Sequence, residues 1–74
     1  MKDKKIQLMI FLKKSELRNQ IWSILKDPKT ATDISKELKK HRSAISRILI
    51  EMEKEGFIKC LNPEDDKFRH YLKK

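Results

Sequence analysis

The feature that most constrains the fold of this chain is residues 30–56, where two amphipathic segments are joined by a short basic turn. In the first segment, Thr30 is suited to cap a helix, and Asp33 follows three residues later with the spacing of a capping box. Ile34 and Leu38 then repeat with the spacing of one helix face. The pattern predicts two helices joined by a tight turn.

The second segment, a predicted helix over residues 42–55, has two different faces. At about 100° per residue, one side gathers the apolar residues Ala44, Ile45, Ile48, Leu49 and Met52. The opposite side, near the N-terminal end, gathers Arg42, Ser43, Ser46 and Arg47. Gly56, the only glycine, is placed to end this helix in a left-handed conformation. Arginine and serine in the first turns of such a helix can reach base edges in the major groove of DNA.

A basic corner lies where the two helices meet. Lys36 precedes the turn, and Lys39 and Lys40 form it without an intervening acid. We expect these three lysines to contact the phosphate backbone of a duplex. The alternative is a solvated turn followed by an ordinary amphipathic helix.

Charge is distributed unevenly along the chain. The 74 residues carry a formal charge of +8, with a pI near 9.8. Basic blocks lie at residues 1–14, 26–47 and 67–74, whereas residues 51–66 are acidic. A strongly basic protein with clustered cations favours a polyanionic partner.

The remaining segments complete a small domain. Residues 15–26 are predicted to form a helix that Pro28 ends; its apolar stripe is Leu17, Ile21, Ile24 and Leu25. After Gly56 the pattern predicts two strands, residues 57–61 and 67–72, around a turn at residues 62–66.

Residues 6–12 are nearly all apolar and too short for periodicity to decide their structure. Their β-branched and aromatic content favours an extended segment, and a continuous helix over residues 4–25 is the alternative. They either pack on the core or form a homodimer contact together with Trp22. The candidate contact residues are Ile6, Leu8, Met9, Ile10, Phe11, Leu12 and Trp22.

Three helices followed by a β-hairpin make a winged helix-turn-helix. Three short motifs recur at fixed places in this pattern: residues 43–47 (Ser-Ala-Ile-Ser-Arg), residues 53–56 (Glu-Lys-Glu-Gly) and the Asn-Pro pair at 62–63. On these motifs the sequence resembles, over residues 15–73, the small archaeal and bacterial regulators of the MarR-like and ArsR-like type. It implies that Lys67 and Arg69 of the wing contact DNA. Three departures are lysines at the turn, Ile50 on the polar side of the second helix, and an acidic wing tip at residues 64–66.

The sequence thus predicts a mainly α, single domain over residues 1–74, with the helix-turn-helix at about 30–56 and the wing at about 57–73, and either a strand or a helical extension before it. The predicted function is a sequence-specific regulator of transcription that binds double-stranded DNA; the alternative is a protein-interaction module of a larger assembly. Catalytic constellations, cofactor motifs, metal-ligand spacings, ligand pockets, a signal peptide and membrane spans are not predicted. A lone cysteine, Cys60, suits the cytoplasm.

Overall fold

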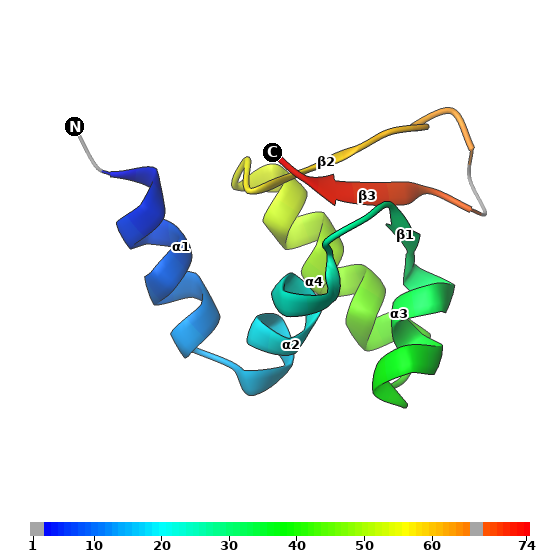
Figure 1. The fold of residues 1–74 in the computed structure, drawn as a ribbon, viewed down its shortest axis with the longest axis horizontal. Helices are drawn as coiled ribbons and strands as arrows, with labels where there is room; N and C mark the ends of the chain where they lie inside the picture. The colour runs from blue at the N-terminus through cyan, green and yellow to red at the C-terminus, as the bar shows by residue number, and fades with distance from the viewer. Residues whose placement is uncertain (1–2, 66–67) are drawn as a thin grey trace.

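In the computed structural model, which describes residues 3–65 and 68–74, the described residues form four helices and a three-stranded antiparallel sheet (Figure 1). The helices are α1 (Lys4–Lys13), α2 (Glu16–Ile24), α3 (Ala31–Leu38) and α4 (Arg42–Lys54). The strands are β1 (Lys29–Thr30), β2 (Ile58–Cys60) and β3 (His70–Lys73). The arrangement is the predicted winged helix-turn-helix, with α3 and α4 as the helix pair and β2 and β3 as the wing.

The N-terminus of α3 is held by the predicted capping box. The Thr30 side-chain oxygen accepts a hydrogen bond from the Asp33 amide at 3.0 Å, and the Asp33 carboxylate accepts one from the Thr30 amide at 3.1 Å. The hydrogen bond that the Thr30 amide donates to this carboxylate favours its ionised form and is the largest cause that lowers the pKa of Asp33. Two amides that the helix itself leaves unpaired are thereby satisfied.

The C-terminus of α4 lies just before Gly56, where the sequence predicted the helix to end. Gly56 adopts a φ of 81°, in the left-handed region that a glycine enters without a steric penalty. Its amide donates to the Glu53 carbonyl at 3.0 Å, and the Phe57 amide donates to the Met52 carbonyl at 2.9 Å. This pair of bonds is the Schellman motif, which turns the chain out of the helix and into the wing.

The core joins α2, α3, α4 and the wing. Seven of its side chains are completely buried: Ile21, Leu25, Ile34, Ile45, Leu49, Met52 and Ile58. Phe57 and Tyr71 complete it at 5% and 6% exposure. Trp22 is half-buried at the edge of this cluster, as expected from its place beside the apolar stripe.

Residues 6–12 are helical, so the preference for an extended segment was wrong. Asp3 caps α1 by accepting a hydrogen bond from the Lys5 amide at 2.9 Å. Leu8, Phe11 and Leu12 share one helical face and pack against the core. The alternative of one continuous helix over residues 4–25 is also wrong. The helix is interrupted at Lys14 and Ser15, and α2 begins after them as a separate helix.

One side chain links α1, α2 and α4. The Arg18 guanidinium lies 4.1 Å from the Phe11 ring centroid and donates to the Phe11 carbonyl at 3.3 Å. Its other terminal nitrogen is 3.0 Å from the Glu51 carboxylate on α4. Phe11 also meets Phe57 edge-to-face at 5.5 Å between ring centroids. These contacts place α1 against the start of the wing.

The sheet has one strand more than predicted, in the order β1-β3-β2. Thr30 pairs with His70 and Lys29 with Tyr71, so the segment that caps α3 also pairs with the wing. The wing strands are shorter than expected, and Cys60 pairs with Tyr71. Within the described parts of the chain, the helices are all too short or too polar to cross a membrane.

Replacing Thr30 with alanine should lower the free energy of unfolding by about 1 kcal/mol, because the Asp33 amide loses its partner. Thr32→Ala is the matched control, since Thr32 lies in the first turn of α3 but outside the capping box. Urea denaturation of both variants measures the difference. Equal losses would contradict the assigned role of the cap.

Candidate nucleic-acid interface

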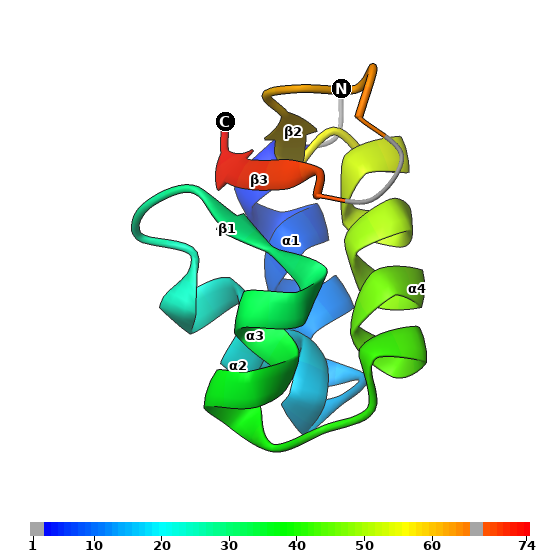
Figure 2. The ribbon, with the colours of Figure 1, turned by 90° about the vertical axis from the view of Figure 1, so that its right-hand side faces the viewer.

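The outward face of α4 is set by what the helix buries. Ile45, Leu49 and Met52 are completely buried on one side. Arg42, Ser43 and Arg47 are exposed on the other, and Ser46 is half-buried at its edge. Figure 2 shows α4 along one side of the molecule, with the connection from α2 to β1 along the opposite side. The polar face is therefore open to a partner along the length of the helix.

The N-terminus of α4 differs from that of α3. His41 occupies the capping position in an extended conformation, but its side chain makes no capping hydrogen bond. The first turn contains no acidic residue and begins with Arg42. Because amides at a helix N-terminus carry partial positive charge, this end adds to the field of the neighbouring cations and suits an anion such as phosphate.

The turn between α3 and α4 is tight although it lacks a glycine. Lys39 adopts φ 56° and ψ 47°, the left-handed conformation that usually selects glycine or asparagine. The Lys40 amide donates to the Ser35 carbonyl at 3.1 Å, and the Ser35 hydroxyl donates to the Lys40 carbonyl at 2.7 Å. The turn thus holds the exposed side chains of Lys39 and Lys40 beside the start of α4.

The cations of this region are not used in ion pairs among the residues that the structure describes. The pairs found there are Arg18 with Glu51, and Lys29 with Asp27 and Glu37. The exposed cations outside those pairs include Lys36, Lys39, Lys40, Arg42 and Arg47. Their charge is directed to solvent rather than to the fold.

The wing loop is organised by two short polar side chains. Asn62 donates to the Phe68 carbonyl at 2.8 Å and accepts from the His70 amide at 2.6 Å. The Asp65 carboxylate accepts from the Phe68 amide at 2.9 Å, so this acid of the wing tip has a structural role. Sequence reasoning identified the Asn-Pro pair but not the bracing by Asn62, which depends on contacts across the loop.

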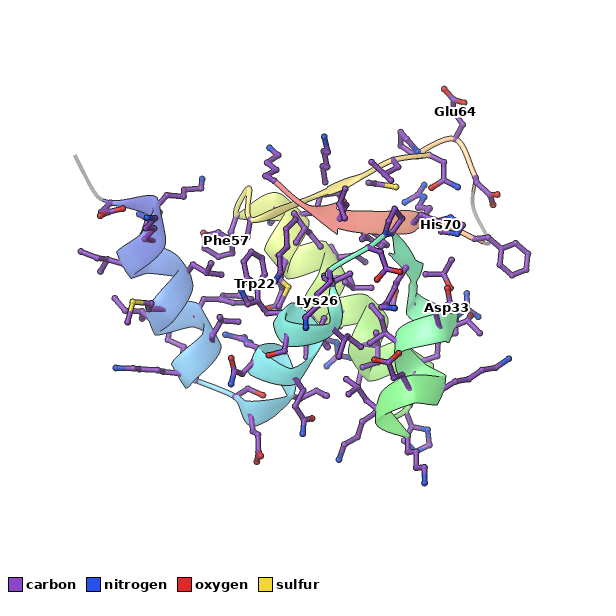
Figure 3. The ribbon with its side chains drawn as sticks, in the orientation of Figure 1. Trp22, Lys26, Asp33, Phe57, Glu64 and His70 are labelled. Carbon is purple, nitrogen blue, oxygen red and sulfur yellow. The ribbon has the colours of Figure 1, made fainter. Side chains whose placement is uncertain are left out.

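Of the two predicted DNA contacts in the wing, Arg69 lies within the described residues. Arg69 is exposed, and its Nε donates to the Asp65 carbonyl at 2.9 Å, so part of its donor set is engaged within the loop. Lys67 lies outside the described residues. Glu64 is exposed at the outer edge of the loop, away from the helices (Figure 3).

A shallow apolar depression lies where α1 meets the end of the wing, a feature that the sequence did not predict. Its volume is about 290 Å³. The lining residues are Lys4, Lys5, Leu8, Trp22, Gly56, Phe57 and Lys74. Lys4 extends over part of it, with Nζ 5.8 Å from the Phe57 ring centroid. Across residues 3–65 and 68–74, no three His, Cys, Asp or Glu side chains gather in a way that could hold a metal ion.

Replacing Lys39 with glycine should raise the free energy of unfolding by about 0.5–1 kcal/mol, because glycine occupies the left-handed region without the cost that a side chain incurs. The matched control is Lys40→Gly, which removes the same charge next to the left-handed position. That control should be destabilising, and urea denaturation measures both. A loss of stability in Lys39→Gly would show that the turn is not strained.

Comparison with known proteins agrees with this geometry. The family model described as bacterial regulatory protein, arsR family, matches residues 3–59, from the start of α1 into the wing. The curated proteins and the solved structures contain no significant match to the chain. Because the family match spans most of the chain and includes the whole helix-turn-helix, this protein belongs to the arsR family and is a DNA-binding transcription regulator.

Proposed function

We propose that the protein binds double-stranded DNA sequence-specifically by inserting α4 into the major groove. The observation that carries the proposal is the exposed polar face of α4, held outward by the complete burial of Ile45, Leu49 and Met52. An α-helix fits the major groove, which is about 12 Å wide. In this pose Arg42 and Arg47 reach guanine edges or phosphates, and Ser43 and Ser46 add shorter hydrogen bonds.

Backbone contacts would come from the turn and from the helix end. Lys36, Lys39 and Lys40 project from the corner beside the start of α4, and each is exposed. At the same corner, the backbone amides at the N-terminus of α4 have no side-chain cap. These uncharged donors could bind a phosphate oxygen. Contacts of this kind set the register of a protein on the duplex without reading its sequence.

The wing is the second contact region in this proposal. Arg69 would approach a phosphate from the braced loop, and the family resemblance assigns the same role to Lys67. Asp65 contributes by ordering the loop that carries Arg69, because its carboxylate accepts a hydrogen bond from the Phe68 amide. We propose in addition that residues 1–74 form a single domain, in which the wing and α4 contact the same duplex.

Self-association through α1 would match a two-fold operator. The structure divides the predicted contact set: Leu8, Phe11, Leu12 and Trp22 pack inward. Ile6, Met9 and Ile10 are more than half exposed on α1. We infer that these three would form the homodimer contact, and dimers of helix-turn-helix proteins commonly bind half-sites about one helical turn apart.

Titration of random-sequence duplex DNA at two salt concentrations tests the class of partner. If about five phosphates are contacted, affinity should fall by roughly two to three orders of magnitude between about 50 and 200 mM salt, because bound counterions are released. Sedimentation in parallel reports the oligomeric state. Absence of binding even at low salt would reject the proposed function and favour a protein-interaction module.

Replacing Arg47 with alanine separates base reading from phosphate binding. We expect a loss of about 1–3 kcal/mol on the preferred site and relaxed selection at one base position. Lys40→Ala should instead weaken all sequences alike and reduce the salt slope by about 1. Fluorescence anisotropy with specific and scrambled duplexes measures both effects.

The matched control is Lys26→Ala. Lys26 is exposed in the connection from α2 to β1, on the side of the molecule away from α4 (Figures 2 and 3). It should retain wild-type affinity for both duplexes. Equal losses in the Lys26, Lys40 and Arg47 variants would mean that the chain binds DNA through net charge rather than through α4.

A further inference from the structure

An aliphatic side chain stands at the centre of the polar face of α4. Ile50 is 54% exposed, although it belongs to a helix whose other large apolar residues are buried or packed against the core. It is seven residues after Ser43, so the two point in directions about 20° apart. Ser46 and Arg47 lie one turn earlier on the same face. If this face enters a groove, Ile50 enters with it.

The fold does not account for an isoleucine at this position. Ile50 is absent from the core cluster and from the partly buried side chains that pack against it. Its exposure also shows that the wing does not cover it. A β-branched residue is a weaker helix former than the Ala, Lys or Glu that an exposed helix position favours. The side chain therefore adds exposed apolar surface without contributing to the core.

The major groove contains one apolar group that distinguishes a base pair, the C5 methyl of thymine. We propose that Ile50 determines specificity by packing against a thymine methyl, next to the base pairs that Ser46 and Arg47 contact. This inference rests on the proposed function and adds an apolar contact beside the hydrogen-bonding side chains of Ser46 and Arg47. Removing that methyl from DNA leaves the base pairing and the O4 acceptor of the same base in place.

The test replaces each thymine of the selected site, one at a time, with deoxyuridine. For the full-length wild-type protein we expect one or two positions at which the substitution weakens binding about three- to fivefold, the effect of burying one methyl group. In Ile50→Ala the same positions should tolerate deoxyuridine without loss. Ile50→Val, which retains the branched carbon, should keep part of the penalty.

A control variant separates this contact from a general effect of surface substitution. Lys26 is exposed on the side of the molecule away from α4, and no DNA contact or dimer contact is assigned to it. Lys26→Ala should keep the full wild-type penalty for deoxyuridine. Thermal unfolding of Ile50→Ala should match wild type, because the position is exposed and alanine favours helix.

The outcomes distinguish the two proposals. If wild type fails to bind duplex DNA at low salt, the proposed function itself is rejected and the thymine contact with it. If wild type binds through Arg47 but no thymine position responds to deoxyuridine, the contact is rejected while the proposed function stands. An equal penalty in wild type and Ile50→Ala would likewise overturn it.

Discussion

Burial of Ile45, Leu49 and Met52 is the constraint on which the rest of this structure depends. In the described residues seven side chains are completely buried, and these three are a large share of them. Exposing them would remove much of the core. Rotating α4 by one residue, about 100°, would expose these three and bury a charged side chain instead. The packing therefore settles which residues of α4 face outward. The ion pair between Arg18 and Glu51 adds a second tie on the flank of the helix.

The parts that sequence reasoning predicted well are those controlled by local chemistry. A capping box needs only Thr30 and Asp33 three residues apart, and a left-handed helix end needs only Gly56 at the right place. The predicted helices at 31–39 and 42–55 match α3 and α4 to within a residue at each end. The polar face of α4 followed from the same periodicity, because the spacing that defines the buried stripe also defines its opposite.

What sequence reasoning missed depends on contacts between distant segments. Residues 6–12 have the composition of a strand, but their helix is selected by the Asp3 cap and by packing of Leu8, Phe11 and Leu12 on the core. The two residues of β1 are too few to show a period and become a strand only because β3 offers an edge. Bracing of the wing by Asn62 also joins residues that are not neighbours in sequence.

The N-termini of α3 and α4 differ in how well their sequences stabilise the helix. At α3, Thr30 and Asp33 satisfy the end amides, and the Asp33 carboxylate complements the helix dipole. At α4 the cap is absent and Arg42 stands in the first turn, an arrangement that is unfavourable to an isolated helix. A phosphate bound at this end would make the arrangement favourable. It would accept hydrogen bonds from the end amides and would also offset the positive charge of Arg42. The cost in stability thus lies at the corner where the Lys39 turn meets the outward face of α4.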